Sequence, residues 1–429
     1  MLITSSYSVE ILGLHKPLKK TMEISRAAAV WLTPVIDGAW EALSGFSGGK
    51  KRFNEAEKLI HGTKQNSARY AFDTAFPKMP SYLRRAVLQH VIGIVSSSHT
   101  QEKAEQERPA GDDHYMPVFY RDNMYRKQED RVLLKLYNGK DWVWEEVRLK
   151  KTDLDYLRKN WSDREAKSPV LVKRYRKYYL QFSFDEEVIL SEKAVNEQKI
   201  CAVDLGIRND AVCSIMTSDG TVAGRKFIRF AAEKDRLGHV VNRVKKKQRE
   251  HGSRSVGSLW AYAARLNEEI ARKTAGAIVE FAKEHGADVI VFEHLDTGGK
   301  IRGKNRQKLH LWKTQTVQKI VEHRAHRAGI RIARVCAGNT SRLAYDGSGE
   351  AVRDPGNRSL AVFQSGKQYN CDLSASYNIG ARYYIREILK PVPETERSAL
   401  AAEVPAVQRR TSCVYADYLK LREAMEKTA

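Results

Sequence analysis

The sequence is poor in cysteine and lacks long apolar runs. It has five cysteines in 429 residues, an odd number scattered along the chain, which is typical of free thiols in a reducing cytoplasm. They are Cys201, Cys213, Cys336, Cys371 and Cys413. No stretch of about 18 apolar residues is present, so we expect no membrane-spanning helix. The first residues lack a basic leader followed by a long apolar core, so we expect no signal peptide.

Acidic residues are too few to balance the basic ones. Lys and Arg number 74 against 52 Asp and Glu, which gives a formal net charge of +22. An excess of this size favours a polyanionic partner, nucleic acid first and a membrane surface second. A basic surface that serves only solubility is the plain alternative. The length fits two or three domains with a sizeable core, and we find no internal repeat.

The most informative stretch is Lys199–Phe230. A short apolar run, Ile200–Val203, ends on Asp204, and Gly206 then allows the backbone to bend. Two further apolar runs follow, separated by turn residues, so we expect three strands in an antiparallel meander. Such a sheet would expose Asp204 at its mouth. An aspartate in that place is either a turn or cap residue or a catalytic carboxylate.

Two later carboxylates follow similar signals. Ala287–Leu295 is a continuous apolar run that closes on Glu293, as in a strand buried on both faces. Asp372 stands near the start of Asn370–Tyr384, which has an approximate helical stripe of apolar residues. Taken alone, Glu293 could be a solvated strand end and Asp372 a helix N-cap.

The order of the three carboxylates favours a shared role. A strand ending in Asp204, two more strands, helices, a strand ending in Glu293 and a helix at Asp372 resemble the RuvC-type RNase H fold. Three carboxylates at one sheet edge repel one another and need cations to stay ionised together. Two Mg²⁺ ions would meet that need, one activating water and the other stabilising the leaving oxygen of a phosphodiester. We therefore predict that all three are catalytic and bind Mg²⁺.

The first part of the chain predicts a small β-barrel interrupted by helices. We expect a strand over Leu2–Leu14 and a polar linker over Ser98–Asp113, with helices between them. The helices are Thr21–Leu43, with a kink at Pro34, Arg52–His61, Asn66–Ala75 and Pro80–Ser97. Short β-like runs follow at 118–120, 131–137, 142–149, 170–173 and 178–184. Asn138-Gly139 joins two of them in a hairpin, and the N-terminal strand could complete the barrel.

Three basic clusters are candidate nucleic-acid contacts. The first alternates with tyrosines, so its cations could pair with phosphates while the rings stack on bases. The second lies on a predicted helix, Ala231–Glu250, and the third in a Gly-containing loop, Lys300–Lys308, a candidate lid. The clusters are Lys173, Arg174, Arg176 and Lys177; Arg243, Lys245, Lys246, Lys247 and Arg249; and Arg302, Lys304 and Arg306. An ordinary solvated surface is the alternative for each.

The later segments complete the predicted nuclease domain. We expect helices over Leu259–His285 and Leu309–Ala328 and a strand over Ile330–Val335. Arg334–Cys371 is rich in Gly, Asn, Ser and Asp, which predicts loops and one hairpin. The tail, Pro391–Ala429, should end helically.

These residues resemble the TnpB RNA-guided nucleases of transposons and their relatives, the miniature type V CRISPR effectors. The resemblance is carried by VDLGIRNDAV, ARKTAGAIVEFAKEHGADVIVFEHL, GIRIARVCAGNTS and CDLSASYNIGARYY. It is specific over about Lys199–Tyr384, and before that it rests on the order of elements and on the helix PSYLRRAV. The size and the helical insertion are most similar to the compact type V-F effectors.

The resemblance implies an RNA-guided DNA endonuclease of the prokaryotic cytoplasm, with a role in antiviral defence. It implies a guide RNA, double-stranded DNA beside a short flanking motif, and Mg²⁺-dependent cleavage of both strands at one RuvC site. It also implies collateral cleavage of single-stranded DNA and, for type V-F effectors, two chains on one RNA. The implied α+β domains are a wedge-like barrel (1–18 and 115–190), a helical recognition insertion (19–114), the RuvC domain (191–335 and 371–429) and a nucleic-acid-binding insertion (336–370).

The sequence departs from the resemblance at the zinc ribbon. Such proteins usually have two Cys-x-x-Cys pairs between the last strand and the final Asp. Here the first pair falls on Ala344 and Gly347, and no second pair exists around Phe363–Tyr369. The region has only Cys336 and Cys371, too few for a tetrahedral site, so we predict no structural zinc.

Two other functions remain open at this point. A guided DNA-binding repressor that has lost cleavage would also be basic and RNA-bound, although the intact carboxylates argue against it. A protein-guided RuvC-like enzyme, such as a junction resolvase or a DDE-like transposase, would use the same carboxylates without RNA. RNA that co-purifies with the protein would exclude most of that second class.

Overall fold

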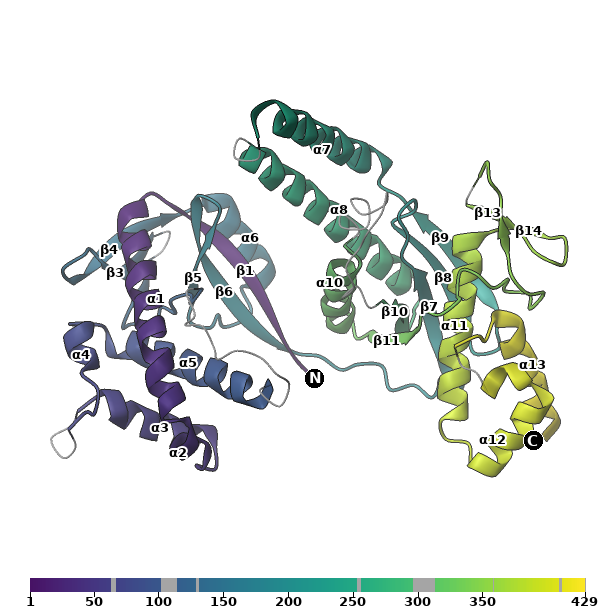
Figure 1. Cartoon of the computed structure of the whole chain (residues 1–429), viewed down its shortest axis with the longest axis horizontal. Helices are drawn as coiled ribbons and strands as arrows, with labels where there is room; N and C mark the ends of the chain where they lie inside the picture. Colours follow the sequence, from purple (N-terminus) through teal and green to yellow (C-terminus); the bar gives the residue numbers. More distant parts are fainter. Residues whose placement is uncertain are drawn as a thin grey trace. The chain divides into compact units, whose positions relative to one another are not determined.

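The computed structural model describes residues 1–62, 67–101, 114–128, 131–252, 256–295, 313–357, 359–408 and 411–428 (Figure 1). The chain divides into two compact units, Thr4–Glu186 and Glu187–Ala429, the second of which also includes Met1–Ile3. Among the helices in the described ranges, none is long and apolar enough to cross a membrane.

A six-stranded sheet forms the first unit. Its strands are β1 (Leu2–Leu12), β2 (Tyr125–Gln128), β3 (Arg131–Tyr137), β4 (Trp142–Leu149), β5 (Val170–Arg174) and β6 (Lys177–Glu187), in the order β2-β3-β4-β1-β6-β5. The N-terminal strand therefore joins the later β-like runs, as predicted. Val118 bridges to Val170 on β5, and the chain then leads directly into β2, so one short segment connects both edges of the sheet. The wedge role of this unit stays a prediction.

Helices follow β1, as the sequence predicts. They are α1 (His15–Gly38), α2 (Trp40–Ser44), α3 (Gly49–Ile60), α4 (Phe72–Ala75) and α5 (Ser81–Gln101). α1 continues through Pro34 and ends only at Gly38. The sequence did not predict α6 (Lys151–Trp161), because only Trp161 of its apolar residues is buried and its periodicity is weak.

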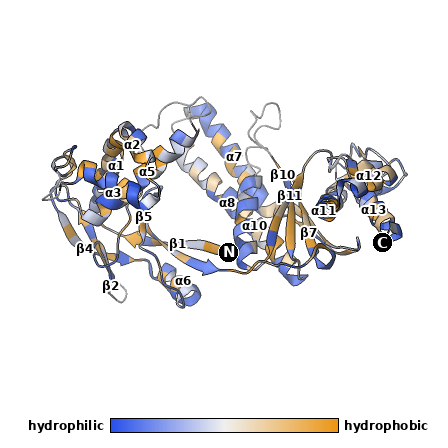
Figure 2. Ribbon diagram, turned by 90° about the horizontal axis from the view of Figure 1, so that it is seen from below, coloured by the Kyte–Doolittle hydropathy of each residue, from blue (hydrophilic) through white to orange (hydrophobic). Residues whose placement is uncertain are grey.

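The second unit is built on a five-stranded sheet. Its strands are β7 (Lys199–Asp204), β8 (Ala211–Thr217), β9 (Val222–Ile228), β10 (Val289–His294) and β11 (Arg331–Cys336), in the order β11-β10-β7-β8-β9. β7, β8 and β9 form the predicted antiparallel meander, and β10 is parallel to both β7 and β11. Figure 2 shows the apolar colouring of these central strands. Burial on both faces accounts for the continuous apolar runs.

Helices cover both faces of this sheet. α11 (Cys371–Leu389) packs on one face, while α8 (Gly257–Glu284) and α10 (Thr314–Arg327) pack on the other. α7 (Ala231–His251) runs beside α8 through an apolar seam that includes Leu237, Val241 and Leu266. The layer made by α11 positions the candidate site, because Asp372 lies in the first turn of that helix.

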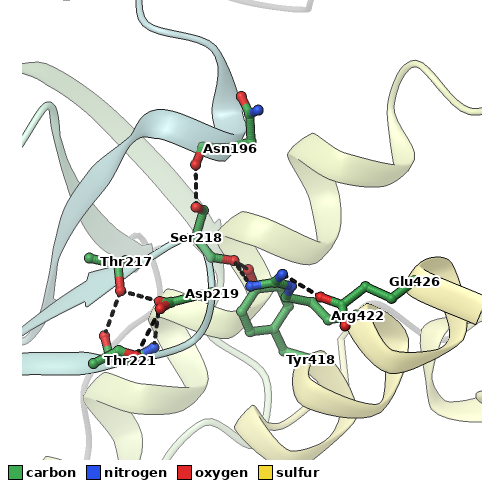
Figure 3. A network of polar contacts seen from close by, with 8 residues as sticks. All are labelled: Asn196, Thr217, Ser218, Asp219, Thr221, Tyr418, Arg422 and Glu426. Carbon is green, nitrogen blue, oxygen red and sulfur yellow. Dashed lines mark hydrogen bonds and ion pairs between the residues drawn. The ribbon is translucent and has the colours of Figure 1, made fainter. Parts of the chain in front are cut away.

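Two helices follow α11, and the second of them holds the turn between β8 and β9. They are α12 (Glu394–Glu403) and α13 (Tyr415–Thr428), and a short 3-10 turn, Val195–Glu197, precedes β7. Figure 3 shows Ser218 at the centre of a polar network: its main-chain oxygen accepts hydrogen bonds from Tyr418 and, at 2.9 Å, from Arg422. The hydroxyl of Ser218 donates to the main-chain oxygen of Asn196. The end of the meander away from Asp204 is therefore fixed to the tail.

A small lobe fills the segment between β11 and α11. Its strands, β12 (Val352–Arg353), β13 (Leu360–Val362) and β14 (Gln368–Asn370), form an antiparallel sheet that contains the predicted hairpin, β13–β14. The buried side chains of Ala344, Ala361, Phe363 and Cys371 make its core.

A carboxylate connects the two turns where a zinc ribbon would carry its cysteine pairs. Asp346 accepts hydrogen bonds from the main-chain N (3.0 Å) and Oγ (2.6 Å) of Ser348 and, across the lobe, from Oγ of Ser365 (2.7 Å). Burial alone raises the pKa of Asp346, but these hydrogen bonds outweigh it and lower the pKa below its usual value. Nearby, Lys367 lies over the rings of Tyr345 and Tyr369. Hydrogen bonding and packing thus order the lobe, and the absence of zinc stays a prediction.

We expect Asp346→Ala to loosen this lobe without unfolding the unit. The substitution removes hydrogen bonds to a charged acceptor, each worth about 1.5–3 kcal/mol where shielded and less at a half-exposed site. Amide hydrogen exchange should speed up over 344–370 and remain unchanged in β7 and β10. Glu350→Ala, which removes only an exposed ion pair with Arg342, is the matched control. Equal exchange in the two variants would show that Asp346 does not order the lobe.

Candidate active site

Two of the predicted carboxylates lie side by side at the ends of parallel strands. Phe292 on β10 pairs with Val203 on β7, so Glu293 and Asp204 occupy the next step of the register. Neighbouring strands are about 4.8 Å apart. The residues two positions earlier in each strand belong to the core beneath α11, and side chains alternate, so both carboxylates are on the α11 face. Each is only 8% exposed.

The third carboxylate reaches this face from α11. Asp372 is the second residue of the helix, but the N-cap is Asn370, whose side chain accepts a hydrogen bond from the main-chain N of Leu373 (3.0 Å). The capping alternative for Asp372 is therefore wrong. Its Oδ2 instead accepts a hydrogen bond from Nδ2 of Asn209 (2.9 Å), in the loop that follows β7.

Close packing fixes α11 on the sheet. A Cβ atom at Gly380 would lie 3.4 Å from Cβ of Ala202 and 3.0 Å from Cε of Met216, so a larger residue would require the Met216 side chain or the helix to shift. Further along, the hydroxyl of Tyr384 contacts the main-chain oxygens of Gln198 (2.7 Å) and Met216 (3.1 Å). These contacts set the position of Asp372 relative to the strand ends.

The electrostatics of Asp204 link all three groups. Burial raises its pKa most, and the charges of Glu293 and Asp372 raise it further, well above the usual value. The guanidinium of Arg353 opposes this shift. Both other carboxylates therefore lie within electrostatic reach of Asp204, and the site holds more negative charge than its surroundings neutralise.

Glu293 is held by a second set of contacts. Burial raises its pKa, while a hydrogen bond from Thr340 and the charge of Arg382 lower it. The hydroxyl of Thr340 donates to Oε1 of Glu293. Arg382 is 4% exposed and donates to the main-chain oxygens of Cys336 (2.7 Å), Gly338 (2.7 Å) and Cys413 (2.9 Å). It thereby fixes the turn that carries Thr340.

Asn378 completes this support one helical turn before Arg382. Its Nδ2 donates to the main-chain oxygens of Thr340 (2.9 Å) and Leu343 (3.0 Å), and its Oδ1 accepts from the main-chain N of Tyr415 (3.0 Å). The same helix that carries Asp372 thus positions the threonine that orients Glu293. The sequence did not identify Thr340, Asn378 or Arg382 as site residues.

The donor set suits Mg²⁺. Within the described ranges, no group of three or more His, Cys, Asp or Glu side chains is gathered closely enough to hold a metal ion by itself. Mg²⁺ is usually held by one or two carboxylates together with water and substrate phosphates. Asp204 and Glu293, paired on one face with Asp372 nearby, fit that chemistry, and a cation would relieve the repulsion that raises the pKa of Asp204.

Sequence reasoning also missed two arginines of this region, one beside Asp204 and one in the loop after β7. Arg353, on β12, lies close enough to lower the pKa of Asp204. Arg208 donates to Oγ of Ser359 (3.3 Å), which connects the loop after β7 to the lobe. The position of Arg353 depends on the fold of the lobe, so no local sequence signal could have identified it.

The structure places the first basic cluster at the tip of the β5–β6 hairpin. Lys173, Arg174, Arg176 and Lys177 are exposed there, around Tyr175, which is 60% exposed and has a left-handed backbone with φ 56°. Lys177 is not free, since its Nζ forms an ion pair with Oε1 of Glu10 (2.6 Å) that raises the Lys177 pKa. The nucleic-acid role of this cluster stays a prediction.

The second cluster lies in the C-terminal half of α7. Arg243, Lys245, Lys246, Lys247 and Arg249 are all exposed. Lys246 is 4.0 Å from Glu250, a weak pair at helical spacing. The third cluster, Arg302, Lys304 and Arg306, lies outside the described residues.

Comparison with solved structures identifies the fold. The chain is similar to Cas12f1, seen in a complex with sgRNA and target DNA, with a TM-score of 0.51 and 14% identity over 77% of this chain and 74% of that one. The chain has the fold of a miniature type V CRISPR effector. The mini-RNA-guided endonuclease CRISPR-Cas_phi3 also matches, at TM-score 0.46 and 9% identity over 88% of this chain and 92% of that one. The Aq_aa04 family model matches residues 5–138. No curated protein matches.

We expect Asp204→Asn to raise the melting temperature of the metal-free protein at neutral pH. The Asp204 pKa is higher in the folded than in the unfolded chain, so the folded state loses stability as pH rises above the usual carboxyl pKa. The amide avoids this loss, and its advantage should disappear below about pH 4.

Thermal unfolding in EDTA between about pH 4 and pH 7 tests the prediction. In a separate measurement without EDTA, Mg²⁺ should raise the melting temperature of the natural protein more than that of the variant. Asp219→Asn is the matched control. Hydrogen bonds from Thr217 and Thr221 lower the pKa of Asp219, so that substitution should destabilise the protein at pH 7. An Asp204→Asn protein that melts at or below the natural temperature at pH 7 would contradict the prediction.

Proposed function

We propose that this protein is an RNA-guided DNA endonuclease with one RuvC-type site formed by Asp204, Glu293 and Asp372. The observation that carries the proposal is the placement of these carboxylates on one face of the five-stranded sheet, within electrostatic reach of one another. The fold likeness to Cas12f1 and the net charge of +22 support it.

The proposed partners are a guide RNA and double-stranded DNA beside a short flanking motif, with collateral cleavage of single-stranded DNA after activation. The Cas12f1 structure contains sgRNA and target DNA, and we extend both partner classes to this chain. The exposed clusters on the β5–β6 hairpin and on α7 are the proposed phosphate contacts. Two chains on one guide RNA is the proposed assembly, and the mass of the purified complex tests it.

The residues of the proposed site have different roles. Asp204, Glu293 and Asp372 would hold Mg²⁺, and bound Mg²⁺ supplies an activated water and stabilises the leaving oxygen. Thr340 holds the Glu293 carboxylate in one orientation. Arg353, beside Asp204, is placed to pair with a phosphate of the strand being cut.

Asp204→Ala should lower the cleavage rate by several orders of magnitude and leave guide-directed DNA binding intact. The substitution removes a metal-binding carboxylate without touching the basic surfaces. The assay incubates the purified protein and its co-purifying RNA with matched duplex and Mg²⁺, and follows cutting and binding separately. Ser218→Ala, at the other end of the meander, is the control. Persistent cleavage by the alanine variant would refute the site, and binding without cutting by the natural protein would favour a repressor.

Thr340→Val should raise the Mg²⁺ concentration for half-maximal cleavage by about 10–100-fold, the usual effect of losing a residue that orients a metal ligand. Valine has nearly the same shape but cannot donate to Glu293. Thr340→Ser keeps the hydroxyl and should restore most of the activity. The measurement is the cleavage rate against Mg²⁺ concentration for the three proteins. A valine variant with the natural Mg²⁺ dependence would refute the positioning role.

A further inference from the structure

A row of side chains crosses the second sheet from the proposed catalytic carboxylates to the edge strand β9. Asp204 pairs with Val212 on β8, and Val212 pairs with Phe227 on β9. Directly paired residues project from the same face of a sheet. Phe227 is therefore on the α11 face with Asp204, two strands away, roughly 10 Å between main chains.

Phe227 is exposed where a buried residue would be expected. Val212, in the middle of the row, is buried in the core beneath α11. Phe227 leaves 49% of its surface exposed on β9, an edge strand of the sheet. An exposed aromatic ring on an edge strand stabilises the fold little and favours unwanted association. Its place in the row suggests that it contacts a ligand of the site.

Positive charge flanks this ring on both sides. Arg225 and Arg229 stand two residues before and after Phe227, and both are exposed. Arg225 donates to the hydroxyl of Tyr377 on α11, which confirms that this side of β9 faces the same way as the active site. Its guanidinium lies 5.8 Å from the centre of the Tyr377 ring. Arg225, Phe227 and Arg229 together are called the β9 strip.

The chemistry of the β9 strip matches single-stranded nucleic acid. An exposed ring accepts a base of any sequence by stacking, and flanking arginines pair with the phosphates on either side. A duplex has its bases already stacked on one another, so a ring of this kind can bind only an unpaired strand. The arginines attract phosphates, so the strip would hold a strand at the edge of the site beside the proposed metal-binding carboxylates.

We propose that the β9 strip binds the single strand of DNA that enters the active site, with Phe227 stacked on a base near the phosphate that is cut. This inference rests on the proposed function, since it assigns the strand-holding surface of the same site. It adds a positioning surface that acts on the substrate beside the metal-binding carboxylates.

The test measures strand binding separately from cutting. The parent protein is the full-length chain with its co-purifying RNA and the substitution Asp204→Asn, so that binding is measured without cutting. The probes are a fluorescein-labelled oligothymidylate and a deoxyribose-phosphate oligomer of the same length without bases. Phe227→Ala should weaken binding of oligothymidylate about 5–150-fold, the equivalent of one stacked base, and leave binding of the baseless oligomer unchanged. Trp260→Ala, which removes another exposed ring of the same unit at the start of α8, should change neither.

Phe227→Trp supplies a local readout. It should bind oligothymidylate like the parent protein, and its additional tryptophan emission should be quenched by that probe and not by the baseless oligomer. The proposal would be overturned if the parent and Phe227→Ala bound oligothymidylate with equal affinity and the emission of the Phe227→Trp variant stayed unquenched. Duplex cleavage by the protein with Asp204 intact is measured in parallel. If the protein cuts duplex DNA but the Phe227 variants bind oligothymidylate like the parent, only this inference is refuted. If the protein neither cuts duplex DNA nor binds the single strand, the proposed function is refuted as well.

Discussion

The parallel pairing of β7 with β10 is the constraint on which the candidate site depends. Their register places Asp204 and Glu293 at the same step of adjacent strands and on the same face. A slip of one residue in either strand would turn one carboxylate to the opposite face, into the core under α8 and α10. The apolar runs before the two carboxylates are continuous, so the runs alone do not fix the register. The helices on each face do so, because α11 packs on one set of alternate residues and α8 and α10 pack on the other.

The site is costly to the folded state, and the surrounding contacts offset that cost locally. Burying carboxylates close together raises the pKa of Asp204, so the bare site opposes folding at neutral pH. Much of the compensation comes from α11. Its residues Asn378 and Arg382 hold the turn that carries Thr340, while the start of the helix supplies Asp372. Helix α11 therefore adds a repelling carboxylate, Asp372, and also restrains the positions of the other two carboxylates. Such a combination is typical of sites that a cation completes.

The sequence predicted the site as far as local patterns reach. Runs that end in Asp204 and Glu293 carry their own strand signal, and the order of the elements suggested that they meet. Asp372 was ambiguous, since an aspartate at a helix start is usually a cap, and Asn370 resolves the question only through a hydrogen bond seen in the structure. Arg353 and Thr340 could not be predicted, because their contacts with the site join residues far apart in the chain. Likewise, the Lys177 charge looked free until β1 placed Glu10 beside it.

The small lobe explains how a chain without zinc-binding cysteines can keep an arginine beside the site. A metal would tie two turns together through strong and directional bonds. Here the carboxylate of Asp346 accepts hydrogen bonds from both turns, and a compact apolar core supports them. Hydrogen bonds are weaker than metal–thiolate bonds, so the position of β12 depends on the packing of the whole lobe and not on two turns alone. Since β12 carries Arg353, the packing of the lobe determines how close this positive charge lies to Asp204, and the electrostatics of the site therefore depend on contacts made outside the five-stranded sheet.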